Sequence, residues 1–114
     1  MGLDVSHDCW HGPYSAFMRF RSQIAMRFGI PDLSRIEGFG GVTPWPESIK
    51  ENPIFVLLDH SDCDGVIEHK DCLPLAERLD AIAPLLESPY REQAIRFADG
   101  LRCAHEKDED VNFS

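Results

Sequence analysis

The sequence lacks any long apolar run. The longest, Ile54–Leu58, is far short of the roughly 20 residues that a membrane-spanning helix requires. No basic segment followed by an apolar stretch opens the chain, which argues against export through a signal peptide. Low-complexity tracts are also missing, which excludes a disordered, collagenous or coiled-coil protein. We therefore expect a cytoplasmic globular protein that does not bind a membrane.

Positive charge is scarce. The chain carries 11 Lys and Arg against 20 Asp and Glu, and its net charge of −9 opposes binding to a phosphate backbone. The charges are partly segregated, because residues 12–36 are basic and residues 53–71 are acidic. Nucleic acid is therefore not expected as a partner, whereas an acidic surface could contact an unknown protein partner.

Cysteine is present without the spacing of a zinc or redox motif. The four copies, Cys9, Cys63, Cys72 and Cys103, include no Cys-x-x-Cys pair. Because no secretion signal accompanies them, we expect reduced thiols rather than a disulfide framework. Cys72 and Cys103 fall in predicted helices, where a free cysteine is typically a small buried side chain.

Apolar residues recur at helical spacing in three segments. The first helix is predicted over 14–28, with its arginines, Arg21 among them, away from the apolar stripe. The second is predicted over 71–86, with Asp71 as its N-cap. The third follows a Ser-Pro pair and is expected over 88–105. Helices therefore dominate the predicted fold.

The remaining segments are short. Residues 38–53 are rich in glycine and proline and are expected to form a loop, while 54–58 fit a short buried helix better than a strand. Weak strands are predicted at 3–7 and 111–113, and we expect these two to lie side by side. A chain of 114 residues fits one compact domain, 1–114. The predicted class is thus α+β, mostly helical, with two or three short strands.

Residues 60–71, His-Ser-Asp-Cys-Asp-Gly-Val-Ile-Glu-His-Lys-Asp, resemble the twelve-residue calcium loop of an EF-hand from its third position onward. Such a loop needs oxygen donors at alternate positions, a glycine at the sixth, a backbone carbonyl at the seventh and a carboxylate at the twelfth. Helices predicted on both sides complete an EF-hand-like helix-loop-helix. The candidate metal ligands are His60, Asp62, Asp64, Val66 (through its carbonyl), Glu68 and Asp71.

Two residues of this loop depart from the calcium pattern. The first position is His60, whose imidazole nitrogen is a poor ligand for a hard cation, and the twelfth is Asp71 rather than glutamate. A nitrogen ligand beside carboxylates suits zinc or another transition metal, so the divalent metal is left open between these ions and calcium. A metal-free alternative also fits, because Asp-Cys-Asp-Gly is a good tight turn and Asp71 could simply cap the next helix.

The N-terminal segment holds a second group of potential ligands. In an extended strand His7, Cys9 and His11 would lie on one side at alternate positions, as a second segment of the same site. This hypothesis predicts that the N-terminal segment and the 60–71 loop meet in space. One alternative is a set of satisfied polar residues beside a buried Trp10. Another is an enzyme with Cys9 as nucleophile and a histidine as base, which is less favoured because no catalytic fingerprint is present.

Two of these segments also carry a family resemblance. The N-terminal run GLDVSHDCWHG at 2–12, followed by Tyr-Ser-Ala-Phe at 14–17, and the run HSDCDG at 60–65 resemble a family of small uncharacterised proteins of bacteria and their phages. The resemblance implies a compact domain in the cytoplasm, the host cell's cytoplasm if the protein is phage-encoded. It implies no particular activity.

Two functions are therefore predicted. The first is a small metal- or ligand-binding protein whose site joins the N-terminal His/Cys segment to the 60–71 loop. The second is an acidic protein-interaction module, such as a phage-encoded modulator of a host protein, with no metal or catalytic site.

Overall fold

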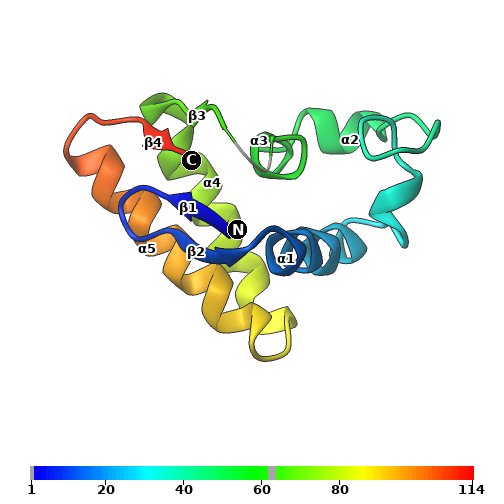
Figure 1. Ribbon diagram of the computed structural model, residues 1–114, viewed down its shortest axis with the longest axis horizontal. Coiled ribbons are helices and arrows are strands. Elements are labelled where there is room, and N and C mark those ends of the chain that lie inside the picture. Colours follow the sequence, from blue (N-terminus) through cyan, green and yellow to red (C-terminus); the bar gives the residue numbers. More distant parts are fainter. Residues whose placement is uncertain (1, 62–63) are drawn as a thin grey trace.

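Two long helices packed along one another form the body of the molecule. In the computed structural model, which describes residues 2–61 and 64–114, these helices are α4 (His69–Ile82) and α5 (Tyr90–Glu106) (Figure 1). They are joined by the short 3-10 turn η2 (Ala83–Leu85). A third helix, α1 (Tyr14–Arg27), lies beside them, as its apolar spacing predicted.

Aromatic side chains from α1, α5 and both ends of the chain pack together in one core. Trp10 stacks on Phe20 at 5.2 Å between ring centroids and meets Phe17 edge-on at 5.3 Å. Phe20 in turn stacks on Phe97 of α5 at 6.2 Å. Phe113, near the C-terminus, packs edge-on against Phe17 at 5.9 Å. All of these rings are buried, so both ends of the chain contribute to the same core.

Two small antiparallel sheets cover this core. The first is the hairpin of β1 (Gly2–Val5) and β2 (Trp10–Pro13), and the second pairs β3 (Val66–Ile67) with β4 (Val111–Asn112). The sheets are linked, because Val5 bridges Phe113 and the backbones of Asp4 and Ser114 exchange two hydrogen bonds. The prediction that the two ends of the chain lie side by side is confirmed.

The part of the chain that follows α1, residues 28–61, is mostly irregular, as predicted for residues 38–53. It contains the 3-10 turn η1 (Leu33–Arg35) and the one-turn helices α2 (Glu47–Lys50) and α3 (Phe55–Leu58). Trp45 anchors it: this buried indole meets the rings of Phe39 and Phe55 edge-on, at 6.0 and 5.1 Å. The loop is therefore held by its own aromatic cluster.

Helix α4 begins earlier than predicted. Its first residue is His69, so Asp71 lies in the first turn and is not the N-cap. The backbone N–H of His69 donates instead to the Asp110 carboxylate at 2.8 Å, and this acceptor lies 41 residues further along the chain. The helix N-terminus is thus capped by another element, which a local reading of the sequence does not reveal.

The observed fold confirms the predicted class, a mostly helical α+β domain. Within the described residues, no helix is long and apolar enough to cross a membrane. The helix that enters the 60–71 loop, α3, is a single turn, whereas the helix that leaves it, α4, is long.

Candidate functional site

The N-terminal ligand candidates lie around a tight hairpin turn, not along one strand. His7 and Asp8 both have φ of 61°, and the N–H of Cys9 donates to the carbonyl of Ser6, so the chain reverses between β1 and β2. Two left-handed residues in succession are typical of a two-residue hairpin turn. The expectation that His7, Cys9 and His11 share one side of an extended strand is therefore wrong.

His7 ties this turn to the C-terminal segment. Its Nε2 lies 2.9 Å from Glu109 Oε1, and its Nδ1 lies 2.8 Å from the hydroxyl of Ser6. The same hydroxyl accepts the backbone N–H of Asn112 at 2.8 Å. Both ring nitrogens of His7 thus have protein partners.

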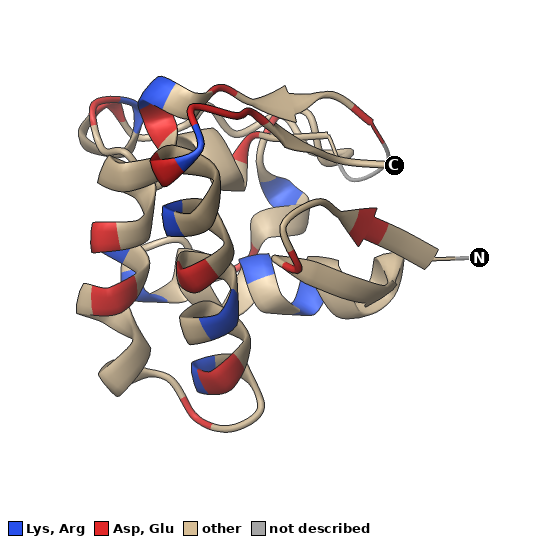
Figure 2. Cartoon of the chain, turned by 90° about the vertical axis from the view of Figure 1, so that its left-hand side faces the viewer, with Lys and Arg blue, Asp and Glu red and all other residues tan. Residues whose placement is uncertain are grey.

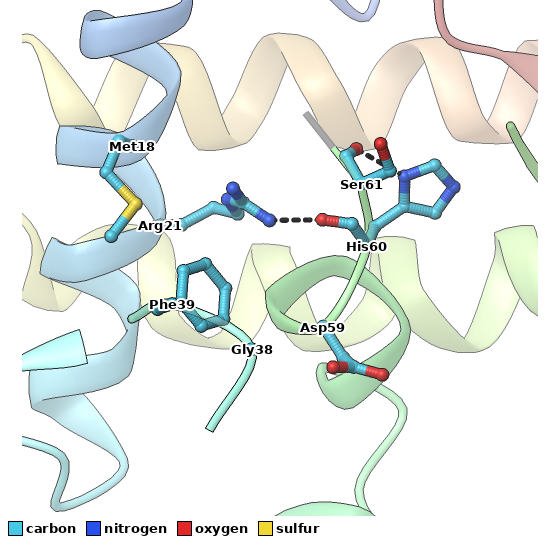
Figure 3. Close-up of a pocket in the computed structure, with 7 residues that line it drawn as sticks. All are labelled: Met18, Arg21, Gly38, Phe39, Asp59, His60 and Ser61. Atoms are coloured by element: carbon cyan, nitrogen blue, oxygen red, sulfur yellow. Dashed lines mark hydrogen bonds between the residues drawn. The ribbon is translucent and has the colours of Figure 1, made fainter. Parts of the chain in front are cut away.

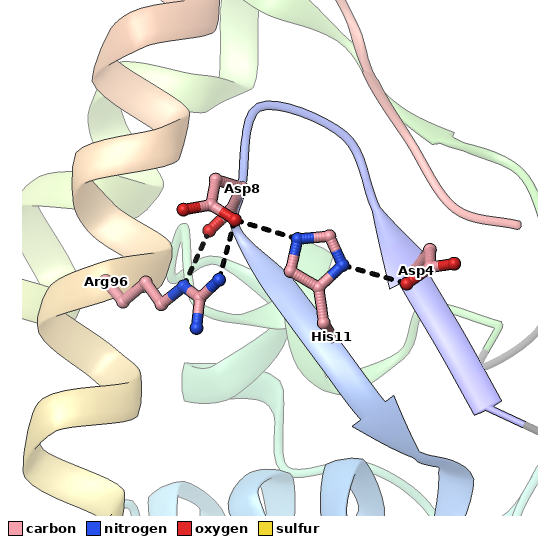
Figure 4. Close-up of polar contacts among 4 residues, drawn as sticks. All are labelled: Asp4, Asp8, His11 and Arg96. Carbon is pink, nitrogen blue, oxygen red and sulfur yellow. Dashed lines mark hydrogen bonds and ion pairs between the residues drawn. The ribbon is translucent and has the colours of Figure 1, made fainter.

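His11 belongs to a charged network on the outer face of the hairpin (Figure 4). Its Nδ1 lies 2.8 Å from Asp4 and its Nε2 2.8 Å from Asp8, and Asp8 also accepts from Arg96 of α5 at 2.6 Å. The hydrogen bond from Arg96, and then that from His11, lowers the pKa of Asp8. Bonding to Asp4 and to Asp8 raises the pKa of His11. This network joins the hairpin to α5.

Cys9 points in the opposite direction, into the core. It is 1% exposed and packs on α5 at Gly100, where a Cβ atom would lie 2.4 Å from its Sγ. Burial, with a smaller contribution from the neighbouring Cys72, raises the pKa of the Cys9 thiol to about 12. A buried, protonated thiol is a poor nucleophile, so the structure contradicts the alternative of a cysteine enzyme built on Cys9.

His60, the first position of the 60–71 loop, bridges the first half of that loop. Its Nδ1 lies 2.7 Å from the carbonyl of Ser61 and its Nε2 3.0 Å from the carbonyl of Val66. The ring also stacks on Phe113, with centroids 3.9 Å apart. His60 therefore faces its own loop and the C-terminal segment, and not the histidines of the hairpin.

The other loop candidates are spread over an exposed surface. Asp64 and Glu68 are exposed, Asp71 is half-buried, and Glu68 lies 3.7 Å from the ammonium of Lys70. Asp62 and Cys63 lie outside the described residues. Among residues 2–61 and 64–114, no group of three or more His, Cys, Asp or Glu side chains is arranged so that it could hold a metal ion.

The N-terminal segment and the 60–71 loop, which were predicted to meet, lie on opposite sides of the C-terminal residues 111–114. The N–H of Ser6 donates to the carbonyl of Asn112, and the N–H of Phe113 donates to the carbonyl of Gly65. Residues 111–114 therefore lie between the hairpin and the loop. The segments share a neighbour through backbone hydrogen bonds, and none of the described side-chain hydrogen bonds joins them directly.

A cavity of about 430 Å³ opens on the other side of His60. It is lined by residues from three parts of the chain: Met18 and Arg21 of α1, Gly38 and Phe39 of the long loop, and Asp59, His60 and Ser61 after α3 (Figure 3). Its volume is in the range of pockets that hold small molecules. Among the described residues of the predicted site, only His60 lines this cavity.

Arg21 is the central charged residue of the cavity wall. Its side chain is 2% exposed, and its Nη1 donates to the carbonyls of Leu58 and His60 at the end of α3 (Figure 3). The guanidinium carbon lies 4.7 Å from the ring centre of Phe17 and 5.1 Å from that of Phe39. A cation is thus held at the cavity by two aromatic faces and by the carbonyls that end α3.

Asp59 supplies the opposite charge. Loss of hydration raises the pKa of its carboxyl group, and the Arg21 guanidinium opposes part of that rise. The cavity wall therefore carries a carboxyl group and a guanidinium cation, with the aromatic ring of Phe39 and the thioether of Met18 as apolar surface.

This cavity was not predicted from the sequence, because Arg21 was expected away from the apolar stripe of its helix and exposed to solvent. Arg21 follows the buried Phe17 by four residues and Phe20 by one, so it belongs to the buried stripe of α1. That spacing was the available signal. The residues of the facing loop carried no such signal in the sequence, because their position depends on how the chain folds back.

Charges of both signs alternate over the long helices. Figure 2 shows Lys and Arg interspersed with Asp and Glu on this side of the molecule. Arg102 of α5, for example, pairs with Asp80 of α4 and with Asp99. The two helices therefore do not present a face of one sign in this view.

The chain matches no family model, no curated protein and no solved structure. The family resemblance of the two motifs accordingly remains a prediction.

Proposed function

We propose that this protein is a small ligand-binding domain whose site is the cavity beside His60. The observation that carries the proposal is the composition of the wall, in which a buried guanidinium, a carboxyl group and an aromatic ring line one space of about 430 Å³. Small-molecule sites are typically apolar hollows with a few convergent polar groups. Compared with the site predicted from the sequence, this cavity keeps two residues of the 60–71 loop, His60 and Ser61. Residues of α1 take the place of the N-terminal segment.

Methionine methyl groups provide a direct test. Met18 lines the cavity, whereas Met26 on the same helix is 53% exposed. In protein labelled with ¹³C at the methionine methyls, a library of small polar metabolites should contain members that shift the Met18 signal saturably while leaving Met26 unchanged.

A pair of matched variants separates binding in the cavity from binding elsewhere. Ser61→Phe adds an aromatic ring at the cavity wall, and Ser48→Phe adds the same ring on the exposed face of α2. The first should abolish the Met18 shift and the second should preserve it. If no library member moves Met18, or if Ser61→Phe binds as well as the natural chain, the proposal is wrong.

Metal binding by the 60–71 loop is the second candidate. It is favoured by the local backbone: Gly65 has φ of 92°, the carbonyl of Val66 faces the side chain at the first position, and α4 begins at the tenth. The ligands would be His60, Asp64, Val66, Glu68 and Asp71, with Asp62 outside the described residues.

Elemental analysis of tag-free protein, paired with thermal melts in EDTA, calcium and zinc, tests this second candidate. About one divalent metal per chain and a melting temperature lowered by EDTA would support it. His60→Ala should then release a transition metal while sparing calcium. Melts that no metal or chelator moves would contradict it and would assign residues 60–71 to a metal-free turn.

A further inference from the structure

A hydroxyl group, an imidazole and a carboxylate are linked in series beside the hairpin turn. Ser6 Oγ lies 2.8 Å from His7 Nδ1, and His7 Nε2 lies 2.9 Å from Glu109 Oε1. Among the histidines that the structure describes, His7 alone joins a hydroxyl to a carboxylate, whereas His11 lies between two carboxylates and His60 between two carbonyls. Proteins activate a hydroxyl as a nucleophile by this order of groups.

The neighbouring bonds indicate where each proton lies. The backbone N–H of Asn112 donates to Ser6 Oγ at 2.8 Å, so the hydroxyl accepts there and its own hydrogen can point toward His7. A carboxylate can only accept, so the His7 nitrogen that faces Glu109 carries a hydrogen. In the neutral imidazole the other nitrogen, Nδ1, then holds the lone pair that can take the proton of Ser6.

The three groups are held in place before any reaction. Ser6 is bonded to Asn112 twice, through its backbone N–H and through its hydroxyl. Successive side chains of a strand point to opposite faces, but the left-handed backbone of His7, with φ of 61°, departs from this alternation, and its ring contacts Ser6. The His7 side chain is 12% exposed, while Glu109 is 53% exposed. The relay is therefore ordered and lies near the surface.

We infer that Ser6 is a nucleophile that takes the acyl group of small, uncharged esters, with His7 as its general base and Glu109 as the positioning residue of that base. Ser6 Oγ forms a bond to the acyl carbon, and its proton passes to His7 Nδ1. The bond between the acyl carbon and the alcohol oxygen breaks, and the alcohol leaves with that proton. Residues 106–110, Glu-Lys-Asp-Glu-Asp, make this surface acidic and disfavour an anionic ester. The activity is separate from the cavity, whose wall includes none of these residues.

p-Nitrophenyl acetate, an uncharged ester with a good leaving group, is the probe. Ser34 is the internal reference, because its exposed hydroxyl donates directly to the Asp32 carboxylate with no histidine between them. After brief exposure of the native chain, peptide mass spectrometry should find Ser6 acetylated about a hundredfold faster than Ser34, since a positioned general base contributes about 10²–10⁴-fold.

The carboxylate is tested by a pair of surface variants. Glu109→Gln should slow acetylation of Ser6 about tenfold or more, whereas Glu106→Gln, an equally exposed change at the end of α5, should leave it unchanged. Histidine ¹⁵N spectra give a readout that loss of packing would not produce. His7 should be the Nε2–H tautomer in the natural chain, and Glu109→Gln should populate the Nδ1–H tautomer, because an amide N–H can donate to Nε2.

His7→Asn removes the base and retains a residue type that tolerates a left-handed backbone. Acetylation of Ser6 should then fall to the rate of Ser34, with circular dichroism as the check on folding; Glu109→Gln carries the test if His7→Asn does not fold. The inference is overturned if Ser6 reacts no faster than Ser34 in the natural chain, if folded His7→Asn or Glu109→Gln reacts as fast as the natural chain, or if His7 is the Nδ1–H tautomer there.

Discussion

Gly100→Ala tests how closely the hairpin turn sits on α5. Alanine normally stabilises a helix interior by about 1 kcal/mol relative to glycine. At this position, however, a Cβ atom would lie 2.4 Å from Cys9 Sγ, 2.7 Å from the carbonyl oxygen of His7 and 3.1 Å from Cys9 Cα. The His7 carbonyl belongs to a turn that backbone and side-chain bonds tie to Asn112, so it has little freedom to move.

The steric cost should exceed the gain in helix propensity. Overpacking a well-packed core costs about 1–3 kcal/mol, and the upper half of that range applies because one of the clashing atoms is a backbone carbonyl oxygen; after the gain in helix propensity the net destabilisation is roughly 1–2 kcal/mol. For a domain of this size the melting temperature should fall by about 5–10 °C, measurable by circular dichroism and by urea unfolding. Cys9→Ala/Gly100→Ala removes the sulfur contact but leaves the His7 carbonyl, so it should be less destabilised than the sum of its single variants. An unchanged or higher melting temperature for Gly100→Ala would refute the close packing.

Three further predictions follow from the polar and thiol groups. Because the pKa of His11 is raised in the folded state, the stability contributed by its imidazolium is present below the unfolded pKa and is lost as pH rises through the folded pKa; His11→Gln should remove this pH dependence from urea unfolding. Asp110→Asn weakens the cap on the N–H of His69, so it should lower the melting temperature and increase hydrogen exchange in the first turn of α4, and unchanged exchange would count against the cap. Burial raises the pKa of the Cys9 and Cys72 thiols to about 12 and 11, so mass spectrometry should find both protected from iodoacetamide at pH 8 until urea is added; rapid labelling of the native protein would show that they are accessible.

Local signals predicted most of the regular structure. The apolar stripes that predicted α1 and α5 depend on residues three and four apart, which is information contained in a short window. The start of α4 was missed because its cap, Asp110, comes from the far end of the chain. Helix termini that are completed by another element cannot be located from the neighbouring residues alone.

The candidate site was less predictable for the same reason. The sequence identified His7, His11 and His60 by their chemistry, and chemistry alone does not say which partners fold next to them. In the structure His7 contacts a carboxylate and a hydroxyl group, His11 contacts two carboxylates, and His60 contacts two backbone carbonyls. The cavity depends on Arg21, which was predicted to be exposed because arginine usually is. Its burial follows from the carbonyls that accept from it, and these lie 37 and 39 residues away.

His60 contacts both Arg21 at the cavity wall and Phe113 of the C-terminal segment, to which the two sequence motifs are hydrogen-bonded. Its carbonyl accepts from Arg21 at the cavity wall, and its ring stacks on Phe113, whose backbone is bonded to Gly65. Phe113 also bridges Val5 of the hairpin. A ligand that moved the Arg21 guanidinium would therefore act first on the backbone of His60 and next on the C-terminal segment that holds both motifs. The hairpin histidines lie at the far end of that chain of contacts, and of the described residues of the two motifs His60 and Ser61 belong to the cavity wall.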